Sequence, residues 1–264
     1  MLNTKGPLLI IANHPNSFLD AIIIGAQYKK RVYFLARGDA FKKRHHRFLL
    51  GLLNMIPIYR IREGKQFLHL NEFAFNKSVE MLGKGYAVLI FIEGVCINTH
   101  ELQPFKKGAT RILEIAQQKG LYPNIHVVGI AYNQMKGIGK KIQLYFSELK
   151  NIKPIQAPKN RIEFNNIVFE ILNKTIQPPT TPSYFNKNIL YYFHLPYYNY
   201  IKKMVAKKTK GTVFFDSVLF GVLLFTYPIF LFIIFLILYL IKTPLPIIFL
   251  ILFSIVLLNK RCLE

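Results

Sequence analysis

The sequence contains little cysteine and few acidic residues. Cys96 and Cys262 are its only cysteines, which excludes a disulfide framework and is usual for a domain that faces the cytosol. No Cys/His spacing typical of a zinc site is present, so we expect neither a structural metal nor a bound cofactor. Only 13 Asp and Glu accompany 35 Lys and Arg, which gives a net charge of +22.

This positive charge is unevenly distributed. Residues 1–212 hold 32 Lys and Arg but 11 Asp and Glu, a net charge of +21, whereas the remaining tail is close to neutral. Such a basic domain binds polyanions, either nucleic acid or an anionic membrane surface. We expect no signal peptide and no N-terminal membrane helix, because the first apolar run, at 8–12, is too short for either.

Two uncharged runs in the tail favour the membrane. Residues 217–241 form a run of 25, and residues 243–259 form a second run of 17, near the lower limit for a span. Lys242 and two prolines separate the runs, and basic residues lie outside both. The positive-inside rule then predicts a helical hairpin with both ends in the cytoplasm. A shallow re-entrant hairpin is the alternative. We expect membrane lipids, and no nucleic acid, as partners.

Short apolar runs alternate with amphipathic patterns along the first two thirds of the chain. The expected strands are 8–12, 32–36, 56–59, 86–92 and 125–131, and the expected helices are 18–27, 39–53, 66–82, 107–119 and 160–176. This rhythm predicts an α/β fold, a mainly parallel sheet flanked by helices, with an edge strand near 141–147.

We therefore divide the chain into three parts. Residues 1–176 form the α/β domain, and residues 177–212 form an aromatic and basic linker at the membrane interface. Residues 213–264 form a transmembrane or re-entrant helical hairpin.

The most informative motif is Asn13-His14-Pro15-Asn16-Ser17-Phe18-Leu19-Asp20, directly after the first expected strand. A histidine at a strand's carboxyl end, with an aspartate nearby, suggests a general base and the carboxylate that orients it. Six residues of continuous helix sweep about 600°, which would separate the two side chains. The pairing therefore requires a turn at 15–17 and a helix that starts near Ser17. The alternative is a surface histidine beside a helix N-terminus.

Three further segments follow in order. They are Ile56-Pro57-Ile58-Tyr59-Arg60, Phe91-Ile92-Glu93-Gly94 and Val127-Val128-Gly129-Ile130. With the His14 motif they resemble, over about residues 6–135, the four blocks of the glycerolipid acyltransferases. That family comprises 1-acyl-glycerol-3-phosphate and glycerol-3-phosphate acyltransferases. Its blocks are an Asn-His followed by Asp, an apolar run ending in Arg, Phe-Pro-Glu-Gly-Thr-Arg-Ser, and a Val-Pro-Val strand.

The resemblance implies transfer of a fatty acyl group from a thioester to a lipid hydroxyl. The donor would be acyl-CoA or acyl carrier protein, and the acceptor 1-acyl-glycerol-3-phosphate, giving phosphatidic acid. His14 would be the general base, held by Asp20. Glu93 and Gly94 would contact the acceptor's glycerol. By family position, Arg37 is a further substrate contact.

Three other cations are candidates for binding the acceptor's phosphate. Arg60 suits bidentate contact, although a solvated surface position is an equal alternative. Lys107 lies where a helix is expected to begin, and helix N-termini favour anions. Arg111, one turn later, could share that role.

The sequence departs from the family in its third block, where Val95-Cys96-Ile97 replaces Thr-Arg-Ser. Five residues separate His14 from Asp20, one more than is usual in the family. The acceptor could therefore be glycerol-3-phosphate or an aminolipid instead. A non-catalytic membrane adaptor is a second alternative. We interpret Cys96 as a small buried side chain and not as a nucleophile.

Overall fold

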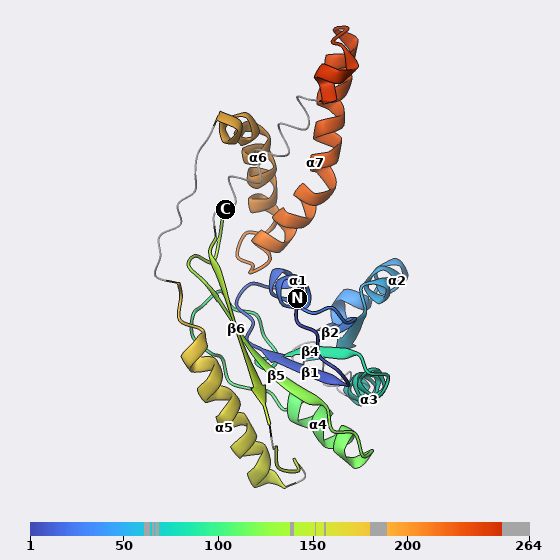
Figure 1. Cartoon of the computed structure of the whole chain (residues 1–264), viewed down its shortest axis with the longest axis vertical. Coiled ribbons are helices and arrows are strands. Elements are labelled where there is room, and N and C mark those ends of the chain that lie inside the picture. The colour runs from blue at the N-terminus through green and yellow to red at the C-terminus, as the bar shows by residue number, and fades with distance from the viewer. Residues whose placement is uncertain are drawn as a thin grey trace. The chain divides into compact units, whose positions relative to one another are not determined.

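The computed structural model describes residues 1–60, 64, 66, 69–137, 140–150, 152–155, 157–179 and 189–249. The chain divides into two compact units (Figure 1). The first comprises Met1–Asn133 and Ile142–Pro179, and the second Gln134–Lys141 and Thr180–Glu264.

A six-stranded sheet forms the centre of the first unit. Its strands are β1 (Leu8–Ala12), β2 (Val32–Arg37), β3 (Met55–Ile58), β4 (Ala87–Phe91), β5 (Asn124–Tyr132) and β6 (Ile142–Leu149). They lie in the order β3-β2-β4-β1-β5-β6, with β6 antiparallel at one edge and the other pairs parallel. The predicted mainly parallel α/β sheet is thus confirmed. Ala12 pairs with both Phe91 and Val128, so β1 and β4 end at the same level, at what we call the carboxyl edge of the sheet.

Helices cover both faces of this sheet. The helices α3 (Leu70–Gly83), α4 (Gly108–Gln118) and α5 (Pro158–Thr175) pack on the main core, which includes Leu9, Val88 and Val127. Helix α1 (Phe18–Gly25) lies on the other side of the sheet from α4 (Figure 1). Alternate residues of a strand point to opposite faces, so Ala12 and His14 lie on the side of the sheet that α1 covers.

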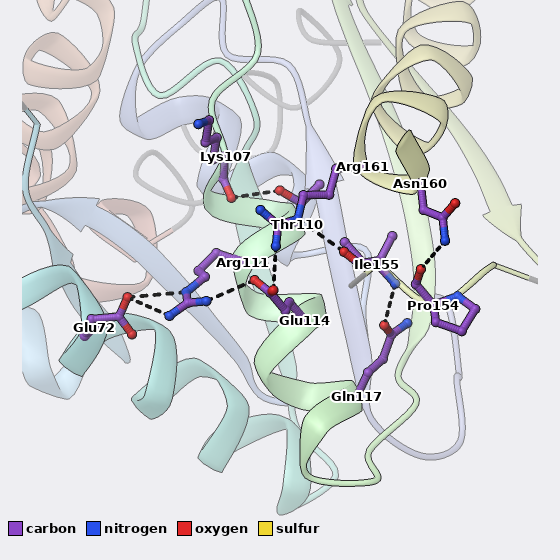
Figure 2. Close-up of polar contacts among 10 residues, drawn as sticks. All are labelled: Glu72, Lys107, Thr110, Arg111, Glu114, Gln117, Pro154, Ile155, Asn160 and Arg161. Carbon is purple, nitrogen blue, oxygen red and sulfur yellow. Dashed lines mark hydrogen bonds and ion pairs between the residues drawn. The ribbon is translucent and has the colours of Figure 1, made fainter. Parts of the chain in front are cut away.

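An ion-pair network ties α3, α4 and α5 together (Figure 2). The Arg111 guanidinium contacts Glu72 Oε1 at 3.1 Å and Glu114 Oε2 at 3.0 Å. Glu114 Oε1 also lies 2.5 Å from Arg161 Nη2. Arg111 thus joins α3 and α4, and its contact to a phosphate stays a prediction.

The expected helix at 39–53 is interrupted. A 3₁₀ helix, η1 (Gly38–Phe41), precedes α2 (Arg44–Leu52), and Lys43 between them has an extended backbone with φ −85° and ψ 140°. An extended residue cannot continue the helical hydrogen-bond ladder, so the pattern forms two elements.

The second unit contains two long helices, α6 (Ile189–Lys208) and α7 (Phe215–Leu240). Helix α6 lies within the residues expected to form the linker. Its Ile201 and Val205 pack with Leu219 of α7. Tyr197, in the expected aromatic linker, stacks on Phe230 with ring centroids 4.4 Å apart.

Helix α7 is long and apolar enough to cross a membrane, and its most apolar stretch is not buried against other described residues. Its 26 residues span about 39 Å at the usual rise, against a hydrocarbon core of about 30 Å. Residues 245–249 are also helical, but the rest of the second apolar run lies outside the described residues. The hairpin therefore stays a prediction.

Candidate active site

The loop after β1 brings His14 and Asp20 together. His14 Nδ1 lies 2.9 Å from Asp20 Oδ2. The required turn is present, because Ser17 has φ +54° and α1 begins at the next residue. A carboxylate only accepts hydrogen bonds, so Nδ1 carries the proton and Nε2 can accept one. The imidazole also stacks on the Phe91 ring, with centroids 3.7 Å apart and planes 9° apart, which fixes its orientation.

Asp20 is fully buried and accepts two further hydrogen bonds. Asn16 N donates to Oδ2 at 2.6 Å, and the Tyr132 hydroxyl donates to Oδ1 at 2.6 Å. A buried carboxylate is costly unless hydrogen bonds replace its hydration. These donors hold Asp20 in one position, and Asp20 in turn holds the imidazole.

Side chains also fasten the backbone of this loop. Asn13 pairs with both backbone groups of Ile130, donating from Nδ2 at 2.9 Å and accepting at Oδ1 at 2.8 Å. Asn98 donates to the carbonyl of Pro15 at 2.8 Å. Cys96 Sγ accepts from Ser17 N at 3.0 Å, and burial raises the pKa of this thiol to about 12. A thiol with such a pKa stays protonated, as expected for a residue that is not a nucleophile.

Glu93 connects the ends of β4 and β1. Its Oε2 accepts from His14 N at 3.2 Å and its Oε1 from Gln103 N at 3.3 Å. Burial raises the pKa of Glu93, although both amides favour the charged form. Gly94 follows with φ +62°, and a Cβ there would meet Lys106 Cγ at 2.8 Å. Both Glu93 oxygens thus contact protein amides, which assigns this carboxylate to positioning His14. A contact to the acceptor stays a prediction.

The candidate phosphate contacts lie farther along the same edge. Arg37 ends β2 and pairs with Asp39 in η1, while Arg60 lies two residues beyond β3. Burial raises the pKa of Asp39, but the nearby cations, Arg37 and Arg60 among them, outweigh it and hold this pKa below its ordinary value. Neighbouring strands lie about 4.8 Å apart. The end of β2, two strands from β1, is therefore about 10 Å from the end of β1, and the end of β3, three strands away, is about 14 Å from it. Lys107 lies at the N-cap of α4, and its carbonyl accepts from the Thr110 hydroxyl (Figure 2).

Sequence reasoning missed Tyr132 and the supporting roles of Asn13 and Asn98. Alternation along β5 places Val128, Ile130 and Tyr132 on one face. Because Val128 pairs with Ala12, this is the face on which His14 lies, so the alternation alone could have indicated Tyr132. Nothing in the sequence showed that α1 would bring Asp20 within reach of its hydroxyl.

A base held by a buried carboxylate, at the carboxyl edge of a parallel sheet, defines an enzyme-like site of the acid–base class. A family model described as "Acyltransferase" matches residues 1–133, half of the chain, and the protein belongs to this family. The expectation of an acyltransferase is thereby confirmed.

The solved structure of the 1-acyl-sn-glycerophosphate acyltransferase PlsC from Thermotoga maritima is similar, with 21% sequence identity and a TM-score of 0.45. The match covers 65% of each chain, slightly less than two thirds of either protein. No curated protein matches the sequence.

Proposed function

We propose that the protein transfers a fatty acyl group from an acyl thioester to a hydroxyl of 1-acyl-glycerol-3-phosphate, giving phosphatidic acid. His14 Nε2 takes the proton of the acceptor hydroxyl as its oxygen attacks the thioester carbonyl. The carbon–sulfur bond breaks, and the imidazolium returns the proton to the departing thiolate. Asp20 keeps the proton on Nδ1 and stabilises the imidazolium, as the aspartate of a hydrolase triad does.

The observation that carries this proposal is the 2.9 Å contact between His14 Nδ1 and the fully buried Asp20. An incidental surface histidine would not have a carboxylate whose two oxygens are held by three donors. His14 itself keeps 18% of its side chain exposed, so a substrate can approach it.

The cations at the edge suit an acceptor with a phosphate. Arg60 and Arg37 offer guanidinium groups, which bind phosphate bidentately, and Lys107 adds a third charge at a helix N-terminus. The family membership supports acyl transfer, and these cations support a phosphorylated acceptor.

A panel of acceptors tests the proposal directly. Purified full-length protein is given one labelled acyl thioester, as acyl-CoA or bound to acyl carrier protein. The acceptors are 1-acyl-glycerol-3-phosphate, glycerol-3-phosphate and an aminolipid. Preferential labelling of phosphatidic acid supports the proposal, whereas labelling of another product names the alternative acceptor. A membrane adaptor would cleave no thioester with any of them.

We further propose that the tail inserts as a hairpin, with the catalytic unit on the cytoplasmic face. Helix α7 and the charges outside both apolar runs support this topology. Membranes that contain the protein should retain it through a salt wash and release it only with detergent. A reporter fused to the C-terminus should stay in the cytoplasm, and its appearance outside would contradict the hairpin.

A further inference from the structure

Helix α2 has an apolar surface that no described part of the protein covers. None of its nine residues is buried. Four apolar side chains at or next to its end are more than half exposed: Phe48 at 67%, Leu49 at 55%, Leu52 at 65% and Leu53 at 51%. Their spacing of i, i+1, i+4 and i+5 places them together on one side, and we call them the α2 stripe.

The surface next to the stripe is strongly basic. Lys42, Lys43, Arg44 and Arg47 are all exposed, and none forms an ion pair with a described carboxylate. The sequence has no Asp or Glu from Ala40 to Arg62. An amphipathic helix with cations beside its apolar face is the pattern of a helix that lies in a membrane interface.

The rest of the first unit holds α2 firmly at both ends. The chain enters from η1, whose Phe41 is 5% exposed, and leaves into β3, whose Ile56 is 4% exposed. Figure 1 shows α2 at the periphery of this unit, where it contacts η1 and β3. The exposed stripe is therefore part of a fixed surface and not of a loose segment.

We propose that α2 docks the catalytic unit onto an anionic lipid surface, with the α2 stripe in the headgroup–acyl boundary and the four cations on the headgroups. This contact is additional to the tail. The charge favours an anionic membrane over a second copy of the chain, since two copies of the same basic surface would repel each other. Lys42 and Lys43, between η1 and α2, follow Arg37 by five and six residues, so the basic start of this surface is close in sequence to the cationic edge of the site.

The sequence offers a clean probe, because it contains no tryptophan. Phe48→Trp places a single indole in the stripe. Phe73→Trp is the matched control, because Phe73 lies on α3 of the same unit and is 64% exposed. Full-length variants are inserted, one chain per disc, into lipid nanodiscs of phosphatidylcholine alone or mixed with phosphatidylglycerol, with and without brominated acyl chains. Far-UV circular dichroism confirms that each variant is folded.

In discs that contain phosphatidylglycerol, we expect a blue-shifted emission for Phe48→Trp and a loss of roughly half its intensity to brominated lipid, because an interfacial helix lies about 5–10 Å deep. The Phe73→Trp variant should show neither change. Replacing the four cations by Gln in the Phe48→Trp background should shift the equilibrium away from docking by about fivefold per cation.

Equal quenching of the two indoles would overturn the proposal, since tethering by the tail alone would explain it. A blue shift at position 48 without quenching would mean that protein covers the stripe, and this also overturns it. If docking were undiminished without the four cations, anionic lipid would not be what α2 recognises, and the proposal would be overturned. The measurement does not depend on acyl transfer, so its outcome is separate from that of the proposed reaction.

Discussion

The loop after β1 and the loops after β2 and β3 lie at the same edge of the sheet but are built differently. In the first, His14, Asp20 and Glu93 all form hydrogen bonds of 3.3 Å or less, and both carboxylates are buried. In the others, Arg37 is exposed and Arg60 is half-buried, and Arg37 pairs with a neighbouring carboxylate in η1.

This difference fits the roles that we propose for the two groups. A general base has to keep one tautomer and one orientation through every turnover, which a rigid set of hydrogen bonds provides. A cation that captures a phosphate can be ordered by the ligand itself, because the charge-assisted contact forms on binding. The comparison predicts that changes in the first group lower kcat, whereas changes in the second raise the KM of the acceptor.

The sharpest test of the first group is His14→Ala. Removal of a general base should lower kcat by about 10² to 10⁴-fold, with normal expression and folding. The matched control is His46→Ala, which removes an exposed imidazole of α2 outside the stripe. Labelled product is measured over time with saturating substrates. A loss smaller than tenfold would remove His14 from the mechanism.

The Tyr132 hydroxyl sharpens the comparison, because it donates to Asp20, the carboxylate that holds His14. Tyr132→Phe should lower kcat by about 10 to 100-fold, since a hydrogen bond to a charged group contributes about 1.5–3 kcal/mol. KM values for both substrates should change little. Tyr28→Phe is the matched control, because it also removes a buried hydroxyl, one that contacts His126 Nδ1 at 3.1 Å. If both variants lose the same activity, Tyr132 has only a structural role.

The sheet was predictable because short apolar runs and their alternation with helical patterns are local signals. The His14–Asp20 pairing was also readable, since the required turn followed from helix geometry. The donors to Asp20 were not, because Tyr132 lies 112 residues away and meets it only after β5 pairs with β1. The sequence did not indicate α6, because the prolines at 178–182 and the tyrosine pairs at 191–192 and 197–198 are typical of a linker at a membrane interface. Packing against α7 stabilises the helix.

Arg60 tests the second group. Arg60→Gln should raise the KM of a phosphorylated acceptor by about tenfold, as one lost charge-assisted contact allows, and leave the KM of the thioester nearly unchanged. Arg37→Gln should also raise the KM of this acceptor, and Asp39, which engages the Arg37 guanidinium, should limit the rise. Arg31→Gln, at the opposite end of β2, is the control for loss of charge alone. Equal effects on both substrates would indicate general electrostatics.

Glu93 should give the smallest effect, a change of protein stability with pH. The direction of this change follows from the burial of its carboxyl group. The pKa of Glu93 is raised above its ordinary value of 4.5, so the unfolded chain releases this proton at lower pH than the folded protein does. As the pH rises from about 4.5 through the raised pKa, the wild type should therefore lose stability relative to Glu93→Gln. Thermal unfolding of both proteins in the same detergent across this range measures the difference.

Glu80→Gln supplies the opposite case for the same measurement. Lys77 and Lys84 lower the pKa of Glu80 to about 2, so any stability that this carboxylate adds is present above its unfolded pKa and lost as the pH falls. Its exposed ion pairs contribute little in any case.

One outcome would contradict the prediction for Glu93. If the stability difference between the wild type and Glu93→Gln stayed constant at every pH, Glu93 would ionise as an ordinary carboxylate. The buried link between β4 and His14 would then not be a feature of the protein in solution.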